Sequence, residues 1–310
     1  MSVPSPTSKD DFDIKETYLN FLKEDPDMTM PVAAIESLVT LLKVKQPSTS
    51  SELQVLLKEQ TELLKNSIPN AISLSAGCDL FMRFVLRNTH LYSDWESCKT
   101  HLVENGQLFV SRAKKSRDKI AEIGLPFIRD DDTILIHSYS RVVLNLLSLA
   151  ASKFIRFRVI VTEARPTCQG IKMFNALKKH NIPAALIVDS AAGYCIDKID
   201  KIFVGAEGVA ESGGIINHIG SYQIGVLAKN SNKPLYVVAE SHKFVRKFPL
   251  APDDLNEEPL KFSVEENDDI NNHGPLIDFT PHEYITALIT DLGVLTPSAV
   301  SEELIKMWYD

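Results

Sequence analysis

The residues best suited to chemistry in this 310-residue chain stand where short apolar runs end. Each of five such runs stops at a polar or charged group: His137, Glu163 with Arg165, Asp189, Glu207 and Glu240. An arginine can pair a phosphate through two parallel N–H donors. Gln169, Asp189 and Asn217 are of the right type to bind sugar hydroxyls. These residues predict a ligand pocket, and the alternative is that loops are simply polar.

The elements that position these groups are the apolar runs themselves. They cover Thr133–His137, Val159–Val161, Ala184–Val188, Lys201–Val204 and Leu235–Glu240. Runs of this length, bounded by Gly, Pro and Asp and separated by helical patterns, are typical of buried parallel strands in βαβ units. Ligands bind outside the carboxyl ends of such strands. We therefore predict an α/β fold with a Rossmann-like parallel sheet.

The segment before these strands has helical periodicity from residue 12 to residue 124. Several amphipathic helices in succession predict a bundle. We expect disorder over 1–11, a helical domain over 12–128 and the Rossmann-like domain over 129–310, with a mobile acidic loop at about 251–274. Two further helices are expected to close the chain, the last beginning at Thr296 and Pro297.

Composition excludes several classes of function. The net charge of −8 and the pI near 5.6 argue against a general nucleic-acid binder. No stretch has the pattern of a signal peptide or reaches membrane-spanning length. The four cysteines are far apart and form no C-x-x-C pair, which is typical of reduced thiols in a cytoplasmic protein. We expect no metal, no cofactor, no membrane and no direct nucleic-acid partner.

One predicted helix, from about Asp94 to Ile123, is rich in basic side chains. They are Arg112, Lys114, Lys115, Arg117 and Lys119. Such a cluster either receives a phosphate or an acidic partner, or forms a solvated helix face. We favour the solvated face.

Four motifs in this order identify a family. They are Arg165-Pro166-x-x-Gln169-Gly170, Val188-Asp189-Ser190-Ala191, Gly205-Ala206-Glu207-Gly208 and Gly213-Gly214-Ile215-Ile216-Asn217. Together they resemble the initiation factor 2B/sugar-phosphate isomerase family, and the resemblance runs over about residues 12 to 310, most closely to its regulatory branch. It implies an N-terminal helical domain joined to a Rossmann-like domain.

The resemblance also implies a function. Regulatory members form a homodimer that organises an exchange-factor complex with beta, gamma, delta and epsilon subunits, which reloads initiation factor 2 with GTP. The exchange chemistry belongs to the epsilon subunit. The regulatory subunit helps to recognise the phosphorylated alpha subunit of initiation factor 2, so that exchange falls under stress. We therefore expect a regulatory subunit and not an enzyme.

Recognition of the phosphorylated partner is associated in this family with the N-terminal helices. Thr49 and Glu52, at the exposed start of a helix, and Phe81 are the candidate contacts. Thr49-x-x-Glu52 also has the spacing of a capping box, so a plain helix cap is the alternative for that pair. The alternative for Phe81 is a core aromatic residue.

The related isomerases use a cysteine after the first strand and an aspartate in a Gly-Ala-Asp motif. This chain has Ser138 and Glu207 at those positions. A serine without a dedicated base is a poorer nucleophile than a thiol, and the longer glutamate shifts its carboxylate by about 1 Å. Catalysis is therefore not expected. The alternatives are an active sugar-phosphate isomerase or a pocket that only senses sugar phosphates.

A pocket without chemistry can still bind a sugar phosphate or nucleotide. Its candidate residues are His137, Ser138, Arg141, Arg165, Gln169, Asp189, Glu207, Asn217 and His218. Amides near Gly213 and Gly214 can hold an anion if they open a helix. His218 stands where the isomerases have a lysine, and a histidine carries only part of a positive charge at neutral pH. The alternative is a structural Arg165–Glu207 ion pair in an empty cleft.

Overall fold

The structure is a computed structural model and describes residues 12–25, 28–45, 47–68, 72–89, 95–249, 255 and 275–309. The chain has the predicted α/β fold. It divides into two compact units, Met1–Lys114 and Lys115–Asp310, and the division falls inside helix α5 (Trp95–Gly124). Our domain boundary after residue 128 remains a prediction. The predicted disorder at 1–11 and the acidic loop, apart from Leu255, lie outside the described residues.

The first unit is helical. Its helices are α1 (Ile14–Glu24), α2 (Met30–Val44), α3 (Ser50–Ser67), α4 (Ile72–Asn88) and the first part of α5. Helix α2 is buried along most of its length, with Ala33, Ala34 and Leu38 fully enclosed. Gly77 of α4 lies against Pro31, where an added Cβ would be 2.4 Å from the Pro31 carbonyl oxygen. The two helices therefore approach closely only because position 77 has no side chain.

The second unit is built on a seven-stranded sheet in the order β11-β10-β7-β4-β1-β2-β3. Its strands are β1 (Thr133–His137), β2 (Arg158–Thr162), β3 (Ala184–Ile187), β4 (Lys201–Val204), β7 (Leu235–Val238), β10 (Ala287–Thr290) and β11 (Gly293–Leu295). All neighbours are parallel except β10 and β11. The five predicted strands are therefore confirmed, and β1 is buried at every residue.

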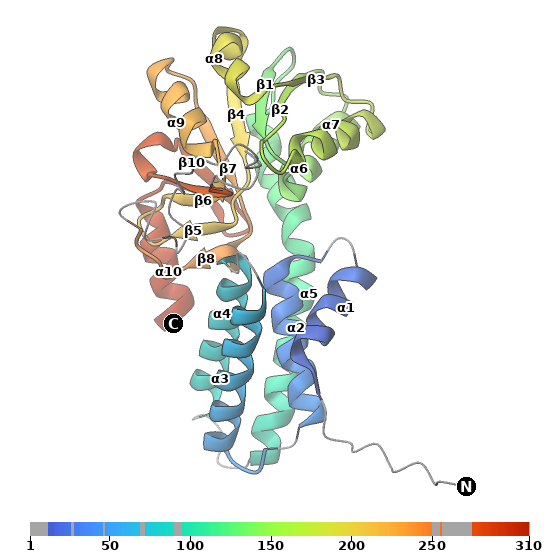
Figure 1. Cartoon of the computed structure of the whole chain (residues 1–310), viewed down its shortest axis with the longest axis vertical. Coiled ribbons are helices and arrows are strands. Elements are labelled where there is room, and N and C mark those ends of the chain that lie inside the picture. The colour runs from blue at the N-terminus through green and yellow to red at the C-terminus, as the bar shows by residue number, and fades with distance from the viewer. Residues whose placement is uncertain are drawn as a thin grey trace, which may run out of the picture. The chain divides into compact units, whose positions relative to one another are not determined.

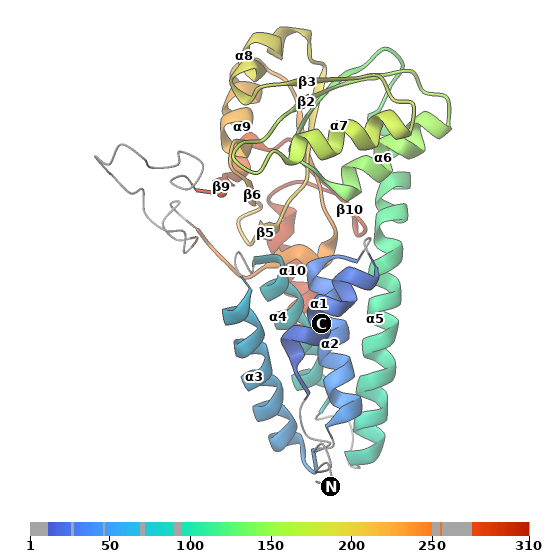
Figure 2. The same cartoon turned by 45° about the vertical axis from the view of Figure 1, so that its right-hand side comes forward.

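Both faces of this sheet are covered. Successive side chains of a strand point to opposite faces, so Ile134 and Ile136 pack with helices α6 (Arg141–Ser152) and α7 (Gln169–Lys179), whereas Leu135 packs with α9 (Ser221–Asn230) and α10 (Ala299–Tyr309). Figure 1 shows α6 and α7 on one side of the sheet and α9 and α10 on the other. In Figure 2, α7 lies alongside β2 and β3.

The chain also forms a four-stranded sheet that the sequence analysis missed. Its order is β8-β5-β6-β9, from β8 (Phe244–Val245), β5 (Gly208–Ala210), β6 (Ile215–His218) and β9 (Ile277–Thr280). Gly213 and Gly214 turn the chain from β5 into β6, with Gly213 at φ 82° and its N–H on the Ala210 carbonyl. The idea that these glycines open an anion-binding helix is therefore wrong.

The C-terminal segment differs from the prediction as well. Between residues 275 and 309 the structure has strands β9, β10 and β11 and one α-helix, α10, instead of two helices. Helix α10 begins at Ala299, and Thr296 bonds through its hydroxyl to Ser298 at 3.0 Å. Short strands of three or four residues carry too little periodicity to be separated from helix turns by pattern alone.

The strand order reverses between β1 and β4. From β1 the chain proceeds through β2 to β3 on one side, and from β4 through β7 to β10 on the other. A reversal of this kind leaves a crevice outside the carboxyl ends of the two central strands. Ser138 follows β1, and Glu207 lies three residues beyond the end of β4. The topology therefore brings these two candidate residues to the same edge of the sheet.

Candidate functional site

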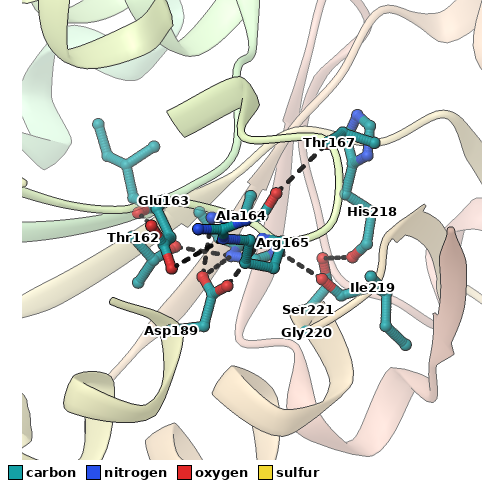
Figure 3. Close-up of polar contacts among 12 residues, drawn as sticks. Thr162, Glu163, Ala164, Arg165, Thr167, Asp189, His218, Ile219, Gly220 and Ser221 are labelled. Carbon is teal, nitrogen blue, oxygen red and sulfur yellow. Dashed lines mark hydrogen bonds and ion pairs between the residues drawn. The ribbon is translucent and has the colours of Figure 1, made fainter. Parts of the chain in front are cut away.

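The loop between β2 and α7 is held by Asp189. Its two carboxylate oxygens accept the backbone N–H groups of Ala164 and Arg165, each at 2.8 Å. Ala164 adopts a left-handed conformation with φ 59°. Figure 3 shows this loop with Asp189 beneath it and the turn from His218 to Ser221 beside it. Asp189 therefore shapes the Arg165 loop, and the sugar-binding role that its residue type suggested stays a prediction.

Arg165 is exposed at the tip of this loop. Its Nε lies 3.3 Å from Glu163 Oε1, and its side chain is 60% exposed. The arginine thus pairs with Glu163 and not with Glu207, so the Arg165–Glu207 alternative is wrong. A guanidinium group has five N–H donors. Those left by Glu163 can bind an anion.

His137 ends β1 with both ring nitrogens occupied. Its Nδ1 is 2.7 Å from the Thr162 hydroxyl, and its Nε2 donates to the Ile219 carbonyl at 2.8 Å. Because the carbonyl can only accept, the proton is on Nε2 and Nδ1 accepts from Thr162. Burial lowers the pKa of His137, although the Ile219 carbonyl and Asp189 act in the opposite direction. His137 is therefore a neutral structural residue that fixes the turn after His218.

Ser138 is buried and adopts a left-handed conformation with φ 62°. Its hydroxyl has no hydrogen-bond partner among the described residues. A serine nucleophile needs an adjacent base, and no base engages this hydroxyl. The arrangement is that of a binding group and not of an activated nucleophile.

Glu207 lies beside β6, the strand that ends at His218, because its backbone N–H donates to the Ile216 carbonyl at 2.9 Å. Burial lowers the pKa of His218, Glu207 raises it and Lys243 lowers it further. His218 is therefore neutral at pH 7. Asn217 precedes it, buried, and donates to the Ser221 hydroxyl at 2.9 Å.

Two further candidates stand at the first residues of helices. Arg141 begins α6 and Gln169 begins α7, and both are half-buried. Gly170, next to Gln169, allows α7 to start tightly against β2, since an added Cβ would lie 1.8 Å from the Thr162 carbonyl oxygen.

A cleft of about 390 Å³ lies beside the Arg165 loop. Its lining includes Arg165, Asp189, Gly220, Tyr222 and Asp278. Asp278 Oδ2 accepts the N–H groups of Gly220 and Tyr222 at 2.8 and 3.0 Å, and burial raises its pKa to about 6. Sequence analysis missed Asp278 because it is 58 residues from Gly220.

Sequence analysis named Glu240 at the end of a strand and Arg117 on a basic helix, but it did not predict that the two meet. The buried Glu240 carboxylate lies 3.3 Å from Arg117 Nε and 3.4 Å from Lys243 Nζ. Lys243 also donates to the Ala206 carbonyl at 2.8 Å. Burial raises the pKa of Glu240, but Lys243, His242 and Arg117 together hold it at about 2. The sequence analysis placed Arg117 on a solvated helix face. The structure instead buries it against Glu240, so this prediction is wrong for Arg117.

The proposed partner contacts lie in the first unit. Thr49 Oγ1 accepts the Glu52 N–H at 3.2 Å, and Glu52 Oε2 accepts the Ser48 N–H at 2.7 Å. These bonds form a cap, and both side chains remain exposed. Phe81 is only 2% exposed and belongs to the core of the unit.

The described residues include no group of three or more His, Cys, Asp or Glu that could hold a metal ion. In the same part of the chain, no helix is both long enough and apolar enough to cross a membrane.

Comparison with known proteins decides the family. Residues 23–297 match the Initiation factor 2 subunit family. The chain belongs to this family. It is 42% identical over 313 residues to translation initiation factor eIF2B subunit alpha of Dictyostelium discoideum, with 96% of this chain and 98% of that protein covered. It is also 32% identical to ribose 1,5-bisphosphate isomerase of Pyrococcus furiosus, with 88% and 86% covered.

The fold agrees with solved members of this family. A chain of the tetrameric eIF2B-beta2-delta2 complex from C. thermophilum superimposes with a TM-score of 0.76 and covers 96% of both chains. The sequences are only 16% identical, so this likeness concerns the fold alone.

Proposed function

We propose that this chain is a non-catalytic regulatory subunit of the guanine nucleotide exchange factor for initiation factor 2. In this proposal it acts in the cytoplasm as a homodimer, joins beta, gamma, delta and epsilon subunits, and helps to sense the phosphorylated alpha subunit of initiation factor 2 under stress. The observation that carries the proposal is the 42% identity to an eIF2B subunit alpha over nearly the whole of both chains.

The site geometry supports a non-catalytic role. Ser138 has no engaged base, and the neighbouring His137 uses both ring nitrogens to hold Thr162 and Ile219. Nucleophilic or general acid–base catalysis needs a group within hydrogen-bond reach that is free to exchange a proton.

The start of helix α3 is the proposed contact for the phosphorylated partner. Thr49 and Glu52 are exposed, whereas Phe81 is enclosed and contributes through packing only. Glu52 has the same sign of charge as a phosphate, so it would contact a basic side chain of the partner and not the phosphate itself.

The deciding experiment measures binding of the purified exchange factor, assembled with and without this chain, to initiation factor 2. The partner carries or lacks phosphate on its alpha subunit. We expect the preference for the phosphorylated form to disappear without the chain. An unchanged preference would contradict the proposal.

Variants of α3 separate the cap from the contact. In Glu52→Gln the side-chain oxygen can still accept the Ser48 N–H, but the charge is lost, and we expect binding of the phosphorylated form to weaken about two- to fivefold. Glu59→Gln, an exposed site on the same helix, is the matched control. Equal effects at both positions would argue against a contact at Glu52.

A second candidate function is sugar-phosphate sensing at the cleft beside Arg165. The cleft volume of about 390 Å³ and the exposed guanidinium favour it. Titration with ribose 5-phosphate tests it, with Arg165→Met expected to weaken binding and Arg156→Met, an exposed arginine, as the control. No binding to the wild-type chain would rule the candidate out.

A further inference from the structure

Helix α7 carries a groove on its outer surface that is separate from the cleft beside Arg165. The groove has a volume of about 570 Å³, and its lining includes Tyr139, Ile171, Lys172, Ala176 and Lys179. From Ile171 to Lys179 it follows α7 for about 12 Å, at the rise of an α-helix. The groove and the cleft share no lining residue. We call this feature the α7 groove.

Part of the lining of the α7 groove is apolar. Ile171 keeps 42% of its surface exposed, on a helix that buries Met173 and Leu177 against the sheet. Tyr139 and Ala176 in the same lining are only half-buried. Apolar surface rimmed by polar groups is typical of sites that bind other proteins. These residues can therefore receive an apolar side chain of a partner.

The charged side chains of the α7 groove are all positive. Lys172 and Lys179 are exposed, and the lining contains no carboxylate within the described part of the chain. The Lys172 Nζ lies 4.3 Å from the centroid of the Tyr139 ring. A cation–π contact of this kind holds the ammonium by its charge, so its N–H donors remain available for carboxylate oxygens.

The excess of positive charge extends over both helices on this face of the sheet. Helices α6 and α7 lie side by side (Figures 1 and 2), and neither contains an aspartate or a glutamate. Helix α7 alone has three lysines, although the whole chain has a net charge of −8. Two acidic groups beside these helices are engaged elsewhere, since Asp118 accepts from Asn145 at 3.0 Å and Glu163 pairs with Arg165.

Charge and apolar surface together indicate the kind of partner. Because both lysines are exposed, they suit carboxylates on a flexible chain better than a small anion that must be enclosed. A nucleic acid would need a broader basic surface than a chain of this net charge offers. The exposed Ile171 also favours a protein segment, which can present an apolar side chain next to its carboxylates.

We propose that the α7 groove is a docking site for an acidic segment of a partner protein. Carboxylates of that segment pair with Lys172 and Lys179, and an apolar side chain between them packs against Ile171 and Tyr139. Because exposed ion pairs are weak and are screened by salt, the affinity is modest and falls as salt is added. The proposal depends neither on the exchange-factor role nor on sugar-phosphate sensing.

Fluorescence anisotropy of the full chain with a labelled peptide tests the proposal. The probe is a synthetic peptide of aspartates and glutamates around a central leucine, and its neutral counterpart has asparagines and glutamines instead. We expect only the acidic peptide to bind. Lys172→Glu/Lys179→Glu should weaken binding about tenfold or more, because two attractions become two repulsions. Lys23→Glu/Lys43→Glu, at exposed positions of α1 and α2, is the charge-matched control.

Two further measurements localise the bound peptide. Ile171→Ser removes the apolar contact without changing the charge and should weaken binding about fivefold. Val188→Ser, at another exposed apolar position, is its control. The thiol of Cys168 also lines the α7 groove, so the bound peptide should slow its alkylation by iodoacetamide. Cys195, which is half-buried and does not line the groove, should react at an unchanged rate.

The outcomes separate a docking site from general attraction between opposite charges. Weaker binding in the α7 variant alone supports the proposal. Failure of the acidic peptide to bind, equal binding of the neutral peptide, or equal losses in both lysine pairs overturns it. Mixed-sequence single-stranded RNA that binds as tightly and depends on the same lysines would overturn the assignment to a protein partner.

Discussion

Arg117 and Glu240 form a buried ion pair at 3.3 Å across 123 residues of sequence. The arginine is 14% and the glutamate 1% exposed. The pair links the part of α5 that lies in the second unit to the carboxyl end of β7. These two elements are far apart in the sequence.

Removing the arginine should lower the stability of the second unit. We expect Arg117→Met to lower the free energy of unfolding by about 3 kcal/mol, since it leaves a buried carboxylate with one cation fewer. Arg156→Met breaks an exposed pair with Asp130 and should cost less than about 1 kcal/mol. Urea denaturation measures the free energy of unfolding of both variants. Equal losses would show that the buried pair stabilises the fold no more than the exposed pair does.

Asp278 gives stability a defined pH dependence. Its pKa is about 6 in the folded chain against 3.8 as the unperturbed value. The folded protein therefore binds this proton more tightly than the unfolded chain, so ionisation of Asp278 opposes folding above pH 6. That penalty, about 3 kcal/mol, disappears as the pH falls from 6 to below 3.8.

The variant Asp278→Asn isolates this effect. His137, His218 and His242 have lowered pKa values and lose stability as the pH falls through 6.5, but both proteins share that contribution. The stability of wild type relative to the variant should rise by about 2 kcal/mol between pH 7 and pH 4, because the unfolded chain also begins to bind the proton near pH 4. Parallel stability curves would refute the assignment.

Gly170 should tolerate no side chain. An added Cβ would lie 1.8 Å from the Thr162 carbonyl oxygen, so Gly170→Ala must displace the start of α7 and the Arg165 loop. We expect a loss of about 1–3 kcal/mol and weaker ribose 5-phosphate binding. At Gly193 of α8 (Ala192–Cys195), the nearest atom would be 3.8 Å away, and Gly193→Ala should be neutral or slightly stabilising. Thermal unfolding of the two variants separates steric conflict from a general effect of alanine.

Turnover of ribose 1,5-bisphosphate should be absent from the purified chain. Ser138 lacks an engaged base, and the ring of His137 is occupied on both sides. Product formation followed by chromatography checks this. Turnover that disappears in Glu207→Gln would show that the site is an enzyme after all.

The parallel sheet was predictable because its central strands are buried on both faces. Such strands appear in sequence as continuous apolar runs, as in Thr133–His137. The small sheet was missed because its strands have two to four residues, and Gly213–Gly214 fits a turn as well as a helix start. Likewise, the sequence indicated that Asp189 belongs to the site, but not that backbone N–H groups occupy its carboxylate.

Other site residues could not be found by spacing at all. Asp278 and Arg117 reach the strand ends from segments 58 and 123 residues away from Gly220 and Glu240. Sequence periodicity reports which face of an element is apolar, but not which distant elements the fold brings together.

The hydrogen-bonded register between β1 and β4 ends at Ile136 and Phe203, before Ser138 and Glu207 are reached. Neither residue takes part in the ladder that holds the sheet together. The side chains at these two positions can therefore differ without any change in the hydrogen-bonded register of β1 and β4. The same sheet can therefore carry different chemical groups at its strand ends.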